Sequence, residues 1–251
     1  MNVLVIAGLD PAGRAGLLAD ADAIRAAGAR PLLCAAATTI QTSKSLRGHH
    51  SIPAEVLERQ ILALAEEEGV SAVKLGMLGS AENLRTLGAL LEREPFSRLP
   101  WVIDPVLRAT SGPSLYEGSV EAYRRLFRRN VVLTPNLAEA GALADRPPPG
   151  NEDEMRGVGQ ILLELGAGAV VVKGGHLEGE ALDLLCLPGG VRRFLAPRLS
   201  VDRRGTGCRL ASFLAARLAL GDPLEEGLRK AKEAVRHYLV EGKLPARPSA
   251  A

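Results

Sequence analysis

The sequence is poor in aromatic residues and has no marked excess of either charge. It holds one Trp, three Tyr and four Phe among 251 residues. The core therefore has to be built mainly from Leu, Val, Ile and Ala, which favours a parallel sheet packed between helices. The net charge is only +2, which argues against nucleic acid or an anionic membrane surface as a partner.

Cysteine is also scarce, and long hydrophobic runs are missing. Cys34, Cys186 and Cys208 stand far apart, so they form neither a metal-ligand spacing nor a disulfide framework. No apolar run approaches the roughly 20 residues that a membrane span needs. The first residues, MNVLVIAGLD, lack the basic start of a signal peptide. We therefore expect a cytoplasmic protein that does not enter a membrane.

Short apolar runs alternate with amphipathic segments along the whole chain. The pattern predicts strands over 2–8, 31–39, 71–78, 101–106, 131–136 and 169–175, a hairpin over 181–196, and helices over 15–28, 53–67, 80–93, 117–127, 136–144, 151–165, 206–220 and 223–241. This alternation predicts a single α/β domain over residues 1–251, doubly wound around a mainly parallel sheet. The polar, weakly periodic segment 38–51 is the best candidate for a lid.

Polar residues follow several predicted strands, where ligands bind in doubly wound sheets. Asp104 could face a metal or a substrate, or it could form an Asx-turn. Asn136 and Glu139 could hold phosphate and magnesium, but their spacing at a helix start also fits a capping box, which is the better interpretation of that motif alone. Lys173 is the kind of point charge that binds phosphate, although most lysines are simply solvated.

The motif GTGC at 205–208 opens a predicted helix. Its glycines allow backbone N–H groups to converge, and the helix adds the positive end of its dipole, which predicts an anion hole for a phosphoryl group. Cys208 in the first turn would have its thiolate favoured and could accept a proton near neutral pH. The alternative is an ordinary helix start with a small buried thiol. The loop GLDPAGRAG at 8–16 is neither a Walker loop nor a dinucleotide-binding loop.

In their order along the chain, these motifs resemble the hydroxymethylpyrimidine phosphate kinases of thiamine biosynthesis, which have the ribokinase-like fold. The matching segments are IAGLDPAGRAGLLAD, VKLGML, VIDPVL, LTPNLAEA, VVKGGH, FLAPR and RGTGCRLAS, and they extend from residue 6 to residue 212. The resemblance implies a kinase that uses ATP and Mg²⁺ to phosphorylate a pyrimidine alcohol or its phosphate. Members of this superfamily often pair, which leaves a homodimer open, but the sequence itself does not give the oligomeric state.

The resemblance assigns a role to each motif residue. It implies a pyrimidine pocket lined by Gly8, Asp20, Gln41, Met77 and Val106, and a magnesium site beside Asp104 and Glu139. Asn136 and Lys173 would approach the nucleotide phosphates. The anion hole would comprise Gly205, Thr206 and Gly207, with Cys208 as the general base on the substrate hydroxyl.

Two other functions remain open from the sequence. The first is a pyridoxal or pyridoxine kinase, although related pyridoxal and sugar kinases commonly have aspartate at the position of Cys208. The second is a non-catalytic paralog that binds a pyrimidine or a nucleotide. In its favour, the chain departs from the family pattern around the site, at Leu9, Arg14, Arg204, Arg209 and Ala211. Retention of the charged motif residues and the thiol favours an active kinase.

Overall fold

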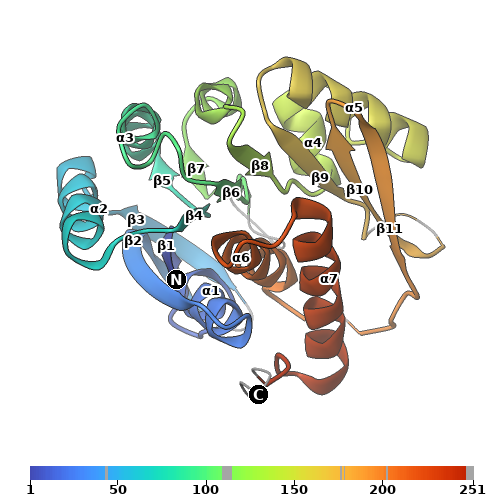
Figure 1. Ribbon diagram of the computed structural model, residues 1–251, viewed down its shortest axis with the longest axis horizontal. Coiled ribbons are helices and arrows are strands. Elements are labelled where there is room, and N and C mark those ends of the chain that lie inside the picture. The colour runs from blue at the N-terminus through green and yellow to red at the C-terminus, as the bar shows by residue number, and fades with distance from the viewer. Residues whose placement is uncertain (43–44, 109–114, 176, 178, 202, 247–251) are drawn as a thin grey trace.

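A nine-stranded mixed sheet forms the centre of the protein in the computed structural model, which describes residues 1–42, 45–108, 115–175, 177, 179–201 and 203–246 (Figure 1). Its strands are, in spatial order, β11 (Gly190–Ala196), β10 (Ala181–Leu187), β9 (Ala169–Lys173), β8 (Val131–Leu133), β6 (Trp101–Ile103), β4 (Ala72–Leu75), β1 (Asn2–Leu9), β2 (Arg30–Gln41) and β3 (Leu46–Ser51). The six strands from β9 to β2 run parallel, whereas β3, β10 and β11 pair antiparallel at the edges. The mainly parallel sheet expected from the sequence is confirmed.

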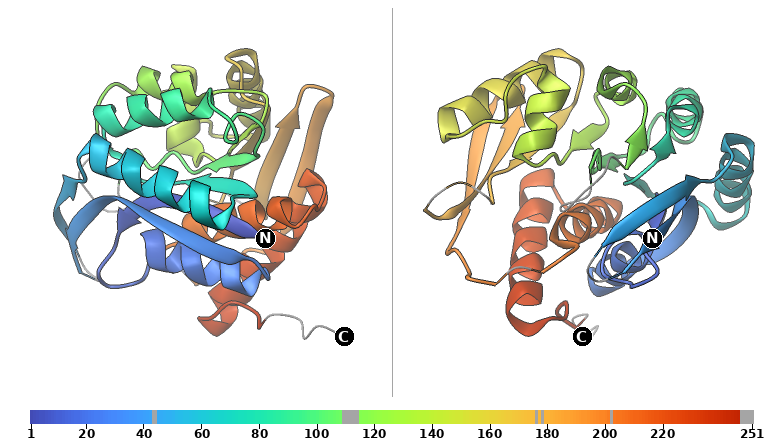
Figure 2. Two further views of the ribbon diagram at one scale, coloured as in Figure 1. Left: turned by 60° about the vertical axis from the view of Figure 1, so that its left-hand side comes forward. Right: turned by 180° about the vertical axis from the view of Figure 1, so that it is seen from behind.

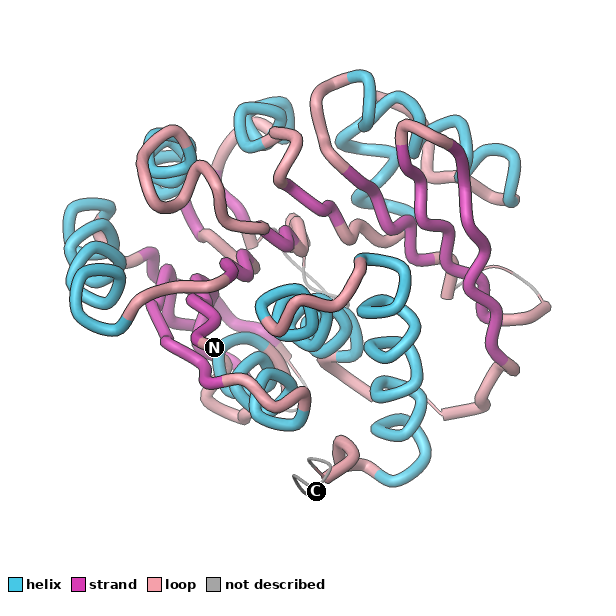
Figure 3. The backbone as a smooth tube through the Cα atoms, in the orientation of Figure 1, coloured by secondary structure: helices cyan, strands magenta, loops and turns pink. Residues whose placement is uncertain are grey.

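Helices cover both faces of this sheet (Figures 1 and 3). One face carries α2 (Ala54–Glu68), α3 (Ala81–Leu91), the 3₁₀ helix η1 (Val120–Leu126), α4 (Leu137–Ala144) and α5 (Glu152–Glu164); the other carries α1 (Gly16–Ala26), α6 (Thr206–Ala219) and α7 (Leu224–Glu241). Side chains alternate between the two faces along each strand. In β1, Leu4 and Ile6 enter the first layer, whereas Val3 and Val5 enter the second.

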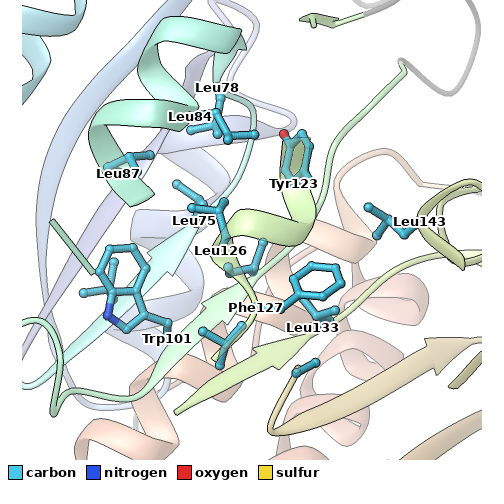
Figure 4. Packing of buried hydrophobic residues seen from close by; sticks show 14 of the residues in the cluster. Leu75, Leu78, Leu84, Leu87, Trp101, Tyr123, Leu126, Phe127, Leu133 and Leu143 are labelled. Atoms are coloured by element: carbon cyan, nitrogen blue, oxygen red, sulfur yellow. The ribbon is translucent and has the colours of Figure 1, made fainter. Parts of the chain in front are cut away.

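The few aromatic side chains concentrate in the first layer. Trp101 and Tyr123 are fully buried there among leucines of α3, β4 and α4 (Figure 4). The indole Nε1 of Trp101 donates a hydrogen bond to the carbonyl of Phe96 at 2.9 Å. The second layer is rich in alanine, which lets α6 lie close to the sheet and to α1 (Figure 2). No helix in the described ranges is both long and apolar enough to span a membrane.

Two segments differ from the expected elements. The described residues of segment 38–51 form a hairpin, in which β2 continues to Gln41 and β3 pairs with it through Thr38↔His50 and Ile40↔Gly48; a lid role for this segment stays a prediction. This hairpin lies at the sheet edge with polar side chains, so hydrophobic alternation does not reveal it. The helix expected over 117–127 is the shorter η1, preceded by β7 (Tyr116–Glu117), which pairs with β5 (Gly79–Ser80).

Candidate active site

The N-terminus of α6 forms the centre of the candidate site. Gly205 precedes it with φ +79°, in the left-handed region, and no side chain caps the helix. A Cβ atom at Gly205 would lie 2.1 Å from the carbonyl oxygen of Arg14, so the close approach of the two loops requires glycine. The first N–H groups of α6, on Thr206, Gly207 and Cys208, have no acceptor within the helix and can bind an anion.

The loop between β1 and α1 faces this helix start. Asp10 holds its shape: Oδ1 accepts a hydrogen bond from the N–H of Ala12 at 2.9 Å, and Oδ2 accepts from Arg14 and Ala15 at 3.2 and 3.1 Å. The side chain is nearly completely buried. We assigned no role to Asp10 from the sequence, although an aspartate followed by proline is a known turn signal.

Lys173 and Asp104 bring the ends of β9 and β6 together beneath the GTGC loop. The Nζ atom of Lys173 donates to Oδ1 of Asp104 at 2.8 Å, and the two side chains are 15% and 5% exposed. A Cβ atom at Gly207 would lie 3.0 Å from this Nζ atom. Burial alone would lower the pKa of Lys173, but Asp104 and Glu139 raise it above its usual value. A permanent positive charge therefore lies at the anion hole.

Asn136 and Glu139 form the capping box of α4 and also face the site. The N–H of Asn136 donates to Oε2 of Glu139 at 2.9 Å, and the N–H of Glu139 donates to Oδ1 of Asn136 at 2.9 Å. Burial, supported by the charge of Asp104, raises the pKa of Glu139 to about 7, although Lys173 opposes this shift. The capping interpretation is thus correct, and it leaves Glu139 beside Asp104 and Lys173.

The two carboxylates fit a divalent cation that also binds a nucleotide. Asp104 and Glu139 place two carboxyl groups beside the single ammonium group of Lys173. No cluster of three or more His, Cys, Asp or Glu ligands occurs in the part of the chain that the structure describes. Mg²⁺ commonly takes one or two carboxylates and completes its shell with phosphate and water.

Asp20 lies below the site, in a completely buried ion pair. Its Oδ2 accepts a hydrogen bond from Nζ of Lys74 at 2.8 Å, and its Oδ1 accepts from the hydroxyl of Ser212 at 2.8 Å. Both charged side chains are 0% exposed. Burial raises the pKa of Asp20, with Lys74 opposing it. Asp20 therefore connects α1, β4 and α6, and its placement in the pyrimidine pocket stays a prediction.

Four of the predicted pocket residues do come together. Met77 packs with Ala37 and Leu115 in a small cluster that Leu46 and Val106 complete. A Cβ atom at Gly8 would lie 2.7 Å from the sulfur of Met77, so Gly8 lies directly against this cluster. Gln41 pairs with Leu46 across the β2–β3 ladder. Gly8, Met77 and Val106 thus lie together at one buried apolar cluster, and Gln41 lies on the adjoining β2–β3 ladder.

Cys208 differs from the expectation in its protonation. Its thiol is half-buried and accepts a hydrogen bond from the N–H of Gly16. Burial raises the pKa of the thiol to about 12; Lys74 opposes this shift, whereas Asp20 and Asp104 add to it. The expectation of a favoured thiolate was therefore wrong, because loss of hydration outweighs the helix start. His176, the last residue of KGGH, lies outside the described residues.

Comparisons with known proteins agree with this geometry. The family model for phosphomethylpyrimidine kinase matches residues 10–246. A hydroxymethylpyrimidine/phosphomethylpyrimidine kinase of Streptomyces coelicolor is 37% identical, covering 96% of this chain and 89% of the relative. The crystal structure of phosphomethylpyrimidine kinase from Clostridium difficile has a TM-score of 0.80 and 30% identity, covering 96% of this chain and 99% of that chain.

A second kind of kinase shares the fold. Pyridoxal kinase from Staphylococcus aureus in complex with pyridoxal has a TM-score of 0.84 and 27% identity, covering 95% of this chain and 87% of that chain. The fold is the ribokinase-like one expected from the sequence. Other matches are multifunctional thiamine biosynthesis proteins, of which this chain spans 31% to 47% of the length.

Proposed function

Because this chain belongs to the phosphomethylpyrimidine kinase family, we propose that it transfers the γ-phosphoryl group of ATP to hydroxymethylpyrimidine, to its monophosphate, or to both. One observation carries the proposal: the uncapped start of α6 lies directly over the ion pair of Lys173 and Asp104. N–H donors, a buried ammonium group and carboxylates are the parts that phosphoryl transfer requires.

Positioning and charge neutralisation account for most of the proposed chemistry. The N–H groups of Gly205, Thr206 and Gly207 would donate to the oxygens of the transferring group, and Lys173 would neutralise charge on the phosphates. Asn136, at the start of α4, would orient the nucleotide. Asp104 and Glu139 would hold Mg²⁺, which supplies further neutralisation of the phosphate oxygens when bound.

Cys208 is the proposed proton acceptor for the substrate hydroxyl. A thiol with a pKa of about 12 is protonated at neutral pH, so a preformed thiolate does not start the reaction. Since the phosphoryl-transfer transition state is loose, the hydroxyl needs to lose its proton only late in the step. The thiol would first release its own proton to water, and its sulfur would then accept the hydroxyl proton as the phosphoryl group is transferred; because the thiolate is scarce at neutral pH, we expect this step to add a modest part of the rate.

The apolar cluster around Met77 supports a flat, heteroaromatic substrate. The ring would lie against Met77 and Val106, with Gly8 allowing close approach and Gln41 offering an amide for ring nitrogens. The second candidate is a pyridoxal kinase, favoured by the structural likeness to the Staphylococcus aureus enzyme. Cys208 favours the pyrimidine substrate. A homodimer and a cytoplasmic location remain predictions from the sequence.

Turnover by the purified protein tests the proposal. ATP consumption with Mg²⁺ is measured with hydroxymethylpyrimidine, its monophosphate and pyridoxal in turn, for the native protein and for Cys208→Ala. Cys186→Ala, which removes a buried thiol in β10 far from the GTGC loop, is the matched control. We expect turnover on a pyrimidine that Cys208→Ala lowers and Cys186→Ala retains.

Each other outcome has a definite meaning. Turnover on pyridoxal alone assigns the chain to the second candidate. Equal turnover by Cys208→Ala and the native protein removes Cys208 from the mechanism while keeping the kinase assignment. Absence of turnover on all three substrates, in a protein that still binds ADP, identifies a non-catalytic paralog.

A further inference from the structure

Arg209 follows the GTGC motif and is almost completely buried, with 5% of its surface exposed. Its Nη1 atom donates to the carbonyl oxygen of Arg14 at 2.9 Å and to that of Gly205 at 3.3 Å, and the carbonyl oxygen of Arg204 lies at 3.5 Å. The single guanidinium group therefore binds both loops that meet at the anion hole, one before α1 and one before α6.

A contribution to stability alone does not explain why a buried arginine occupies position 209. A positive charge in the first turn of a helix opposes the helix dipole, and burial of a charge without a counter-ion is costly. Throughout the described ranges, no carboxylate lies within ion-pair distance of Arg209, and its buried Nε atom has no hydrogen-bond partner. The guanidinium group of Arg209 instead donates its hydrogen bonds to backbone carbonyls beside the site.

Tyr238, in the last turn of α7, supports Arg209 from below. The guanidinium carbon lies 4.0 Å from the centre of the Tyr238 ring, a cation–π contact. The hydroxyl of Tyr238 donates to the carbonyl oxygen of Arg204 at 3.2 Å. The last turn of α7 thus reaches the loop before α6, and Nε of Arg203 strengthens the connection by donating to the carbonyl of Leu239 at 2.9 Å.

These contacts, together with the backbone bond from the N–H of Arg209 to the carbonyl of Gly205 at 3.0 Å, hold the direction of the N–H groups in the loop. In a trans peptide, the C=O and the following N–H point in opposite directions. Bonds that draw the carbonyls of Arg204 and Gly205 toward Arg209 and Tyr238 therefore turn the N–H groups of Gly205 and Thr206 the other way, toward the predicted phosphoryl position. We infer that Arg209 and Tyr238 are a pair of positioning residues that orient the anion hole of this protein.

This inference rests on the proposed function, so its test includes a measurement without turnover. Arg209→Met keeps an unbranched, flexible side chain but removes the donors, the charge and the cation–π contact with Tyr238, Arg209→Lys keeps the charge, and Tyr238→Phe keeps the ring but removes the hydroxyl. Arg217→Met is the matched control, because Arg217 lies later in α6 and bonds to Asp222 and the carbonyl of Ala27. Binding of AMP-PCP and of ADP is measured by calorimetry for each variant, together with kcat and KM.

We expect Arg209→Met to lower kcat at least about tenfold, since loss of an oxyanion donor costs about 100-fold or more and here donors are misdirected rather than deleted. KM for the pyrimidine should stay within about threefold. AMP-PCP, which carries a group at the γ position, should lose more affinity than ADP. Arg209→Lys should restore part of both losses, Tyr238→Phe should show a smaller loss of the same kind, and Arg217→Met should show neither loss.

The results separate this inference from the kinase proposal. A native protein that binds AMP-PCP but turns over none of the substrates contradicts the kinase proposal, and the AMP-PCP and ADP affinities of the variants still decide the role of Arg209. Equal losses for the two nucleotides, or kcat losses no larger than those of Arg217→Met, overturn the positioning role. A native protein that binds neither nucleotide overturns both.

Discussion

The ammonium group of Lys173 lies 2.8 Å from the carboxylate of Asp104, where the GTGC loop passes over both. The three parts come from β9, β6 and the start of α6, which are far apart in the sequence. The loop can approach this closely because residue 207 is glycine. We therefore expect activity to depend on the distance between the GTGC loop and the ion pair.

Replacing Gly207 by alanine should lower activity without lowering stability. The added Cβ would lie 3.0 Å from Nζ of Lys173, so the ammonium group has to move away from the phosphate site. Gly207 is the second residue of α6, where alanine gains less than the roughly 1 kcal/mol that it gains over glycine in a helix interior, so the melting temperature should stay close to that of the native protein. We expect kcat/KM for ATP to fall at least about tenfold.

Gly157→Ala in α5 is the control for this substitution. Apart from its chain neighbours and the backbone of its own helix, no atom lies within 4 Å of a Cβ built at Gly157, so the same change should stabilise the protein by about 0.5–1 kcal/mol and leave kinetics unchanged. Full activity in Gly207→Ala would show that Lys173 does not need its present position.

Breaking the buried ion pair below the site should destabilise the whole fold. Asp20→Asn leaves the charge of Lys74 without a counter-ion at 0% exposure, which costs about 3–5 kcal/mol in comparable buried pairs. Chemical denaturation at pH 7 measures the change. Asp222→Asn, at a more exposed cluster with Arg217 and Lys230, should cost clearly less.

The double variant Asp20→Asn with Lys74→Met shows whether the loss of stability comes from the unpaired charge of Lys74 or from altered packing. If the uncompensated ammonium group causes the loss, removal of both charges should recover part of the stability. A double variant as unstable as the sum of both single variants would show that packing, not charge, makes Asp20 important.

The sequence allowed the layers and the carboxyl-edge residues to be predicted, because both depend on local patterns. Alternation in β1 separates Leu4 and Ile6 from Val3 and Val5, and the ends of short strands place Asp104 and Lys173 at one edge. Such hydrophobic patterns show only how residues two to four positions apart are placed on a strand or helix.

The features that could not be predicted from the sequence depend on contacts between segments far apart in the chain. Lys74 and Asp20 are 54 residues apart, and Arg209 and Arg14 are 195 apart, so no spacing reveals either contact. The pKa of Cys208 depends on how deeply α6 is buried against α1, which a helix-start motif does not encode. The hairpin of β2 and β3 was missed because its edge position removes the alternation.

Replacing Gly8 by alanine should weaken binding of the pyrimidine substrate and leave binding of the nucleotide unchanged. The new Cβ would lie 2.7 Å from the sulfur of Met77, so Met77 has to shift and the predicted pyrimidine pocket that it lines changes shape. We expect KM for the pyrimidine to rise at least about tenfold and KM for ATP to change little. Steady-state kinetics with each substrate varied separately measure both values.

Gly8→Ala with Met77→Ala provides the internal check. Shortening Met77 removes the overlap, so the double variant should bind the pyrimidine better than Gly8→Ala alone. A rise in KM for ATP instead of the pyrimidine would place the ring elsewhere and contradict the assignment of Gly8, Met77 and Val106.

Glu139 should make stability fall as pH rises from about 4.5 to about 7. Its pKa is raised from an ordinary value of 4.5 to about 7 in the folded protein, so between these values the folded state holds a proton that the unfolded chain has released. Stability then decreases with pH across this window. Glutamine can keep the capping bond to Asn136 but carries no charge, so Glu139→Gln should be more stable than the native protein at pH 8, by about 2 kcal/mol.

At pH 4.5 the two proteins should be nearly equal, because Glu139 is then protonated in the folded state. Glu154 is the matched control: it caps α5 through Asn151 and Gly150 but is exposed, so Glu154→Gln should not reproduce the pH-dependent gain. Urea denaturation of the three proteins between pH 4.5 and 8 measures the difference. A constant offset between Glu139→Gln and the native protein across this range would mean that Glu139 is already ionised in the folded protein, with Lys173 compensating its charge fully.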